Sequence, residues 1–197
     1  MDPSPVPAPP PVAAAASRTR PIAEAPELAL LAVDLLRTPS ALTALTADES
    51  RAVVAYMRLV SYPAGATVMR EGDQVHTGYM LLLLSGEVSV ETVEPSHTDP
   101  VAISVLGPGN LLGEMSLLDG EPRSVSCRAV TRIEAGGLSR EALERLLREN
   151  PAVGARLMTA VAKRLADRLR AAGDQLRMYS HIVGDLKTRL HALEWRP

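Results

Sequence analysis

The sequence predicts an α+β protein in which short antiparallel strands form a sandwich or barrel, flanked by N-terminal helices and one long C-terminal helix. Between residues 58 and 133, short β-branched or alternating runs are separated by Gly, Pro and Asp. Turn signals recur there at roughly eight-to-twelve-residue spacing, which is typical of antiparallel sheets. Apolar residues recur at helical spacing before this region and again after Ser139.

Composition limits the classes of function. Of the 197 residues, 46% are apolar and 3% aromatic, so the core must consist mainly of Leu, Val and Ala. The net charge of −2 gives no overall attraction to nucleic acid. The single cysteine, Cys127, excludes an internal disulfide and a multi-thiolate metal site. No apolar run approaches the ~20 residues of a membrane span, and no signal peptide is recognisable, so we expect a cytoplasmic protein.

The N-terminal part is predicted to contain a tail and two helices. Residues 1–21 are rich in Pro and Ala, which predicts a disordered tail. Residues 22–37 carry a helical stripe of leucines that ends before Pro39. A second helix is expected from Thr46, a good N-cap followed by acidic residues, to about Met57.

Six runs then have the character of strands. They are Arg58–Tyr62, Thr67–Arg70, Tyr79–Ser85, Glu87–Thr92, Val101–Leu106 and Val125–Val130. In the last run, alternation places Cys127 on the same face as Val125, which indicates a buried structural cysteine.

The C-terminal part is predicted to be helical throughout. One helix should start at the N-cap Ser139 and end before Pro151. Beyond Pro151, apolar residues are spaced alternately by four and three: Leu165, Leu169, Ala172, Leu176, Tyr179, Val183, Leu186, Leu190 and Leu193. A sustained period of about 3.5 residues favours a parallel coiled-coil homodimer. The expected units are therefore a tail (1–21), a domain (22–150) and a dimerisation helix (151–197).

The stretch from Leu112 to Ser126 carries the strongest functional signal. Gly113 allows a close approach of the backbone, and Met115, Ser116 and Leu117 could open a helical turn whose free N–H groups face an anion. Arg123 offers a planar set of donors to phosphate oxygens. Because Glu114 would repel a phosphate, its expected partner is a sugar hydroxyl. Together, these residues suit a sugar phosphate.

This stretch resembles the phosphate-binding cassette of the cyclic-nucleotide-binding domain family, which includes catabolite activator-like sensors. Four other glycine motifs appear in family-like contexts: Pro63-Ala64-Gly65, Glu71-Gly72-Asp73, the run from Tyr79 to Val88, and Gly107-Pro108-Gly109. The resemblance covers about residues 45–169 and implies a jelly roll. It implies these ligand-binding residues: Gly113, Glu114, Met115, Ser116, Arg123, Ser124 and Arg168.

The identity of the base stays open. The place at which the catabolite activator protein reads adenine falls here at about Arg168-Leu169. Arg168 could contact a purine, or it could form an interhelical ion pair in a coiled coil. Ser124 is compatible with cAMP, and a hydroxyl there is also typical of cGMP-preferring members. We favour cAMP as the ligand, with cGMP and a cyclic dinucleotide as alternatives.

The expected function is that of a regulatory sensor, not an enzyme. After Tyr179 too few residues remain for the winged helix-turn-helix of the family's transcription factors, so we expect no specific DNA binding. A metal-dependent cupin-type enzyme would need clustered histidines, whereas His76, His97, His181 and His191 are scattered. We therefore expect no catalytic residues, metal or cofactor. Ligand occupancy would pass through the C-terminal helices to an effector protein. The alternatives are a truncated transcription regulator and a dimeric scaffold.

Overall fold

The computed structural model describes residues 17–92 and 101–194, and the two antiparallel sheets among them face each other. The five-stranded sheet has the order β1-β2-β9-β4-β7, and the four-stranded sheet has the order β3-β8-β5-β6. The strands are β1 (Ser17–Pro21), β2 (Arg58–Tyr62), β3 (Thr67–Met69), β4 (Tyr79–Ser85), β5 (Val88–Thr92), β6 (Val101–Leu106), β7 (Leu111–Leu112), β8 (Ser126–Ala129) and β9 (Ile133–Ser139). The predicted α+β jelly roll is confirmed, although its sheets do not close into a barrel.

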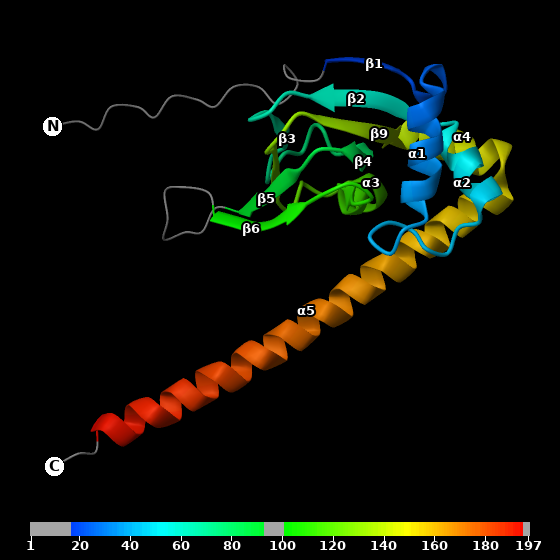
Figure 1. Ribbon diagram of the computed structural model, residues 1–197. Coiled ribbons are helices and arrows are strands. Elements are labelled where there is room, and N and C mark those ends of the chain that lie inside the picture. Colours follow the sequence, from blue (N-terminus) through cyan, green and yellow to red (C-terminus); the bar gives the residue numbers. More distant parts are fainter. Residues whose placement is uncertain (1–16, 93–100, 195–197) are drawn as a thin grey trace, which may run out of the picture.

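The helices gather at one side of the sheets, and a single long helix leaves from there (Figure 1). They are a 3-10 turn η2 (Ile22–Glu24), α1 (Pro26–Leu36), α2 (Ala47–Val54), α3 (Glu114–Asp119), α4 (Arg140–Glu149) and α5 (Pro151–Glu194). Both predicted N-caps are present. The Thr46 hydroxyl accepts from the Glu49 amide at 3.2 Å, and the Ser139 hydroxyl accepts from the Ala142 amide at 3.2 Å.

The N-terminal tail departs from the prediction in one part. Ser17–Pro21 are not disordered but form β1, which pairs antiparallel with β2 at the edge of the five-stranded sheet. Residues 1–16, the rest of the predicted tail, lie outside the described residues. The strand adds a partner to β2, so the sheet begins earlier in the chain than the composition suggested.

Strand alternation divides the apolar side chains between two cores. Leu81, Leu83 and Cys127 belong to an inter-sheet core between the two sheets. Met80, Leu82 and Leu138 point to the opposite face of the five-stranded sheet and join a helical core with α1, α2, α4 and the start of α5. Because successive side chains of a strand point to opposite faces, β4 can serve both cores.

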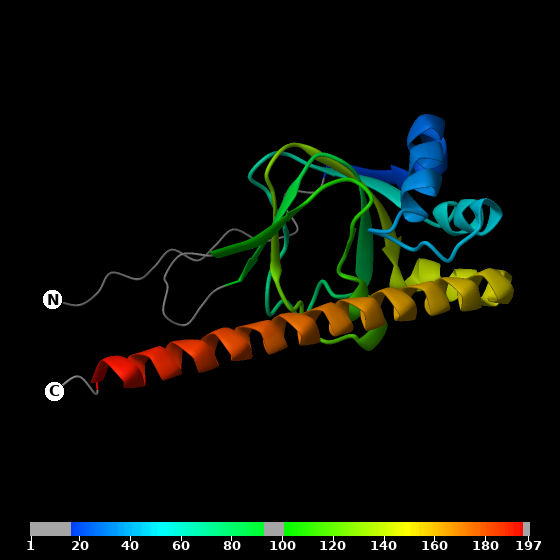
Figure 2. The ribbon, with the colours of Figure 1, turned by 60° about the horizontal axis from the view of Figure 1, so that its bottom comes forward.

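The long helix α5 contacts the domain only along its first part. Leu157, Ala160 and Val161 are buried in the helical core, whereas every described side chain from residue 174 to residue 188 is exposed. Figure 2 shows the remainder of α5 running on as one straight helix. Its exposed apolar side chains include predicted coiled-coil positions: Leu169, Leu176, Tyr179, Val183 and Leu186. The side chains of Leu190 and Leu193 lie outside the described ones.

Candidate functional site

The segment after β7 turns sharply into α3. Gly113, its N-cap, has a φ of 74°, a left-handed conformation that side-chain-bearing residues rarely adopt. A Cβ placed there would lie 2.3 Å from Nη1 of Arg123 and 2.7 Å from Cε of Met69. Gly113 is therefore required both for the backbone turn and for the close packing of Arg123. The first amides of α3 have no intrahelical acceptor, as at any helix N-terminus.

All seven residues of the predicted site line one cavity of about 390 Å³. They are Gly113, Glu114, Met115, Ser116, Arg123, Ser124 and Arg168. The cavity lies between the inter-sheet core, α3 and the first half of α5, and its apolar lining includes Met69, Val90 and Leu106. Segments that are far apart in the sequence therefore come together here.

Arg123 is buried, with a relative exposure of 3%, and its donors are directed at backbone carbonyls. Nε and Nη2 donate to the carbonyl of His76 at 3.0 and 2.7 Å. Nη2 also donates to the carbonyl of Tyr79 at 2.9 Å, and Nη1 donates to the carbonyl of Gly113 at 2.9 Å. The guanidinium carbon lies 4.5 Å from the centre of the Tyr79 ring. Since a guanidinium has five N–H donors, one on Nη1 remains for a ligand.

Glu114 connects the cavity to the long helix. Its side chain is 3% exposed, and its Oε1 accepts from Nη1 of Arg168 at 2.5 Å. Arg168 itself remains 59% exposed. The structure shows an ion pair of Arg168 with Glu114 of the same chain, a partner that neither interpretation of Arg168 named.

Sequence reasoning missed Arg164, which lies one helical turn before Arg168 and also lines the cavity. Its Nη1 donates to the carbonyl of Ser40, and its buried Nε has no hydrogen-bond partner among the described residues. Burial lowers the pKa of Arg164, an effect that the nearby Glu114 carboxylate opposes. The four-residue spacing of two arginines on one helix face was the signal that could have identified it.

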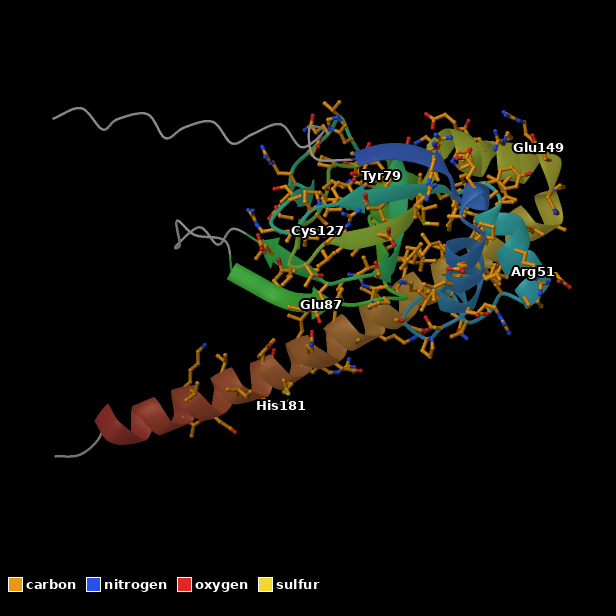
Figure 3. The ribbon with its side chains drawn as sticks, turned by 45° about the horizontal axis from the view of Figure 1, so that its top comes forward. Arg51, Tyr79, Glu87, Cys127, Glu149 and His181 are labelled. Carbon is orange, nitrogen blue, oxygen red and sulfur yellow. The ribbon has the colours of Figure 1, made fainter. Side chains whose placement is uncertain are left out.

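Cys127 was predicted to be buried, but not to line the cavity. It is 3% exposed and belongs to the cavity wall, and Figure 3 places it among the strands. Burial raises the pKa of its thiol to about 11, against a smaller opposing effect of Arg123. Burial also lowers the pKa of Arg123 itself. The cavity therefore disfavours a thiolate and holds an arginine whose charge has no carboxylate partner among the described ion pairs.

Two further classes of site can be checked within residues 17–92 and 101–194. No group of three or more His, Cys, Asp or Glu side chains there is placed to hold a metal ion. None of the helices in these ranges is long and apolar enough to cross a membrane. The same described residues contain no winged helix-turn-helix, since α5 continues as one helix to Glu194.

Comparisons with known proteins agree with this geometry. The sequence profile of the cyclic nucleotide-binding domain matches residues 59–150. The chain is 34% identical over 123 residues to the cyclic AMP receptor protein of Thermus thermophilus, covering 62% of this chain and 56% of that protein. It is 29% identical over 127 residues to a CRP-like cAMP-activated global transcriptional regulator of Mycobacterium tuberculosis, covering 64% and 52%. The chain thus spans about half the length of these curated relatives.

A solved structure extends the similarity beyond the profile. The cyclic nucleotide-binding domain from Methylobacillus flagellatus KT superimposes with a TM-score of 0.64 and 31% sequence identity. The match covers 78% of this chain and 83% of that domain. The cassette turn, the buried arginine behind it and these matches lead to the same assignment: the chain belongs to the cyclic nucleotide-binding domain family.

Proposed function

We propose that the chain is a regulatory sensor that binds a cyclic nucleotide, with cAMP as its ligand, in the cavity behind α3. The observation that carries this proposal is the convergence of the α3 N-terminus, Arg123 and Glu114 on one cavity of about 390 Å³. An anion favours free amides and a guanidinium, whereas a carboxylate favours hydroxyl donors. A phosphate joined to a ribose carries both kinds of group.

The contacts of Arg123 define how a phosphate would be held. Three carbonyls already fix the guanidinium, so it would act as a preorganised positive charge with one free Nη1 donor. The amides at the start of α3 would supply the other donors. A bidentate contact with Arg123 would require it to give up the carbonyl of Gly113. The sequence alone suggests that the planar set of guanidinium donors is free to bind phosphate oxygens, whereas in the structure most of these donors are already engaged.

The proposed transmission route begins at two residues of α3. Leu117 is buried in the helical core, which also contains Leu143 of α4 and Leu157 of α5. Glu114 holds Arg168 of α5 directly. A ribose hydroxyl that donates to Glu114 would compete with Arg168, and an inward movement of α3 would carry Leu117 with it. Both changes would reach α5 and, through it, an effector protein.

We further propose that the exposed stripe of α5 forms a parallel coiled-coil dimer. The stripe runs from Leu169 to Leu186, along the part of α5 whose described apolar side chains are exposed. Its period is that of a coiled coil, and exposed apolar side chains in such a row favour association. Residues 22–150 would then form the ligand-binding unit and residues 151–197 the dimerisation helix.

The arginines of α5 favour cGMP as a second candidate ligand. Arg164 and Arg168 both line the cavity, and both offer only donors. Guanine presents two neighbouring acceptors, O6 and N7, whereas adenine pairs the N7 acceptor with an amino donor. A base that reached this helix would therefore be read more favourably if it were guanine.

Isothermal titration of the purified chain against cAMP, cGMP and a cyclic dinucleotide tests the proposal. Saturable binding of cAMP, at least as tight as that of cGMP, is the expected result. Tighter binding of cGMP would select the second candidate. If none of the three binds, the proposed function is wrong. Titration of Ser124→Ala and of an exposed control, Ser180→Ala, would show whether a cavity contact determines the affinity.

A further inference from the structure

A second cavity, of about 310 Å³, lies on the inter-sheet face of the five-stranded sheet, at the end where β4 begins. Its lining is dominated by three aromatic rings, those of Tyr56, Tyr62 and Tyr79, above a floor that includes Val60 and Leu81. Small-molecule sites are typically cavities of about 300–1,000 Å³ with mainly apolar and aromatic walls and a few polar groups. This cavity has that size and that character.

The polar groups of this second cavity favour an anion. Arg58 lies at its edge, is exposed, and uses Nε and Nη2 only for Thr19 of β1. Among the described residues, no carboxylate lies within ion-pair distance of Arg58, and none lines the cavity. Burial raises the pKa of Tyr62, and a hydrogen bond to the Tyr79 hydroxyl acts in the same direction, so the Tyr62 phenol is already engaged with its neighbour. A cation that has no carboxylate partner among the described residues therefore lies beside aromatic rings.

Two acidic groups that contact lining residues of this cavity are already paired. Asp73 accepts from the amides of Val75 and His76 and contacts Nδ1 of His76 at 3.0 Å. Glu149 accepts from the Tyr56 hydroxyl at 2.7 Å and lies 3.9 Å from Arg145. These contacts offset the negative charge of the two carboxylates locally, so Asp73 and Glu149 do not compete with an anion for Arg58.

The two cavities share a wall. Tyr79 and His76 line the second cavity, and their carbonyls hold the guanidinium of Arg123, which lines the first. The Tyr79 ring also lies against that guanidinium, 4.5 Å from its carbon. A molecule stacked on the tyrosines would therefore press on the backbone and the ring that position Arg123.

We propose that the second cavity binds a planar aromatic monoanion, with its anionic group on Arg58 and its ring among the three tyrosines. We further infer that its occupancy changes the affinity of the first cavity through Tyr79, His76 and Arg123. Only this coupling rests on the proposed cyclic-nucleotide function, whereas the second site does not.

Titration of the full chain with naphthalene carboxylate, followed by NMR of the backbone amides, tests the site. We expect saturable shifts at Val60, Tyr79 and Gly137, with weaker binding of the neutral naphthalene carboxamide and of the non-aromatic anion decanoate. Arg58→Gln should weaken naphthalene carboxylate binding by about tenfold or more, because a charge-assisted contact is lost. Arg132→Gln, a matched change at an exposed arginine near the other end of β9, should leave it unchanged.

Three results would overturn the second site. They are the absence of saturable shifts, equal affinity of wild type and Arg58→Gln, and decanoate binding as tight as that of the aromatic anion. Because cyclic nucleotide is absent from this titration, such a failure would not touch the proposed function.

The coupling is tested by titrating cAMP with and without saturating naphthalene carboxylate. A change in cAMP affinity that is lost in Arg58→Gln is expected. Linkage requires cAMP to change the affinity for naphthalene carboxylate by the same factor. Unchanged cAMP affinity, in a chain that binds both compounds, would overturn the coupling while leaving both sites in place.

Discussion

Replacement of Arg123 by alanine should destabilise the protein as well as weaken ligand binding. The substitution removes a buried guanidinium that satisfies the carbonyls of His76, Tyr79 and Gly113. The carbonyl of Gly113 keeps a second donor, the Leu117 amide at 3.3 Å, so two carbonyls, those of His76 and Tyr79, lose the partner that Arg123 provides. A polar group left without its partner costs at least about 1 kcal/mol, so these two carbonyls give about 2 kcal/mol. Loss of the contact with the Tyr79 ring adds roughly 0.5–1 kcal/mol. The sum is a large fraction of the ~5–15 kcal/mol that stabilises a typical domain.

Urea unfolding of wild type, Arg123→Ala and Arg123→Lys, each with and without cAMP, separates the two effects. Without cAMP, Arg123→Ala should lower the free energy of unfolding by about 3 kcal/mol. Arg123→Lys should lie between the two, because an ammonium keeps the charge and reaches fewer carbonyls. Addition of cAMP should stabilise only proteins that bind it. If Arg123→Ala unfolds at the wild-type urea concentration, the structural role assigned to these hydrogen bonds is wrong.

Three further predictions concern the cavity and the long helix. Burial raises the pKa of Cys127 to about 11, so the stability that the buried thiol contributes is present below the unfolded thiol's pKa of about 8.5 and is lost as pH rises through 11. Saturating cAMP should also slow the modification of Cys127, the single cysteine of the sequence, by a disulfide reagent. An unchanged modification rate would contradict the place of this thiol in the cavity. Gly113→Ala should abolish cyclic nucleotide binding in calorimetry, because its Cβ would meet Arg123 at 2.3 Å; wild-type affinity would contradict this packing. Leu176→Glu with Leu186→Glu should convert a dimer to monomers in light scattering, whereas a monomeric wild type would exclude the coiled coil.

Local sequence patterns predicted the strands that alternate and the helices that carry caps, but they missed β9. This strand contains Gly136 and Gly137, and glycine is unfavourable inside strands. In the fold, a Cβ at Gly136 would lie 3.1 Å from Sδ of Met57, and one at Gly137 would lie 3.3 Å from Cδ2 of Leu81. Close packing on both faces of a central strand therefore overrides local propensity, and no single-sequence pattern reveals it.

Some features of the site could likewise be predicted from a contiguous segment, whereas others depend on residues that are far apart in the sequence. Gly113 and Glu114 were identifiable because the cassette is contiguous, and Arg123 because it follows in the same segment. The carbonyls that hold Arg123 come from His76 and Tyr79, about forty-five residues earlier, and only the folded chain brings them together. For the same reason, the sequence could not show that the Arg123 donors are already engaged.

The ion pair between Glu114 and Arg168 limits how strongly a ligand could move α5. Because Arg168 remains 59% exposed, the pair is screened by solvent and contributes no more than about 1 kcal/mol. Displacing it with a ribose hydroxyl would change the equilibrium constant between two positions of α5 by a factor of only about five. A stronger switch must draw on the helical core, where Leu117 of α3 is buried in the same cluster as Leu157 and Val161 of α5. In the proposed mechanism, therefore, Glu114 and Arg168 adjust the response, and the repacking of Leu117 supplies most of its free energy.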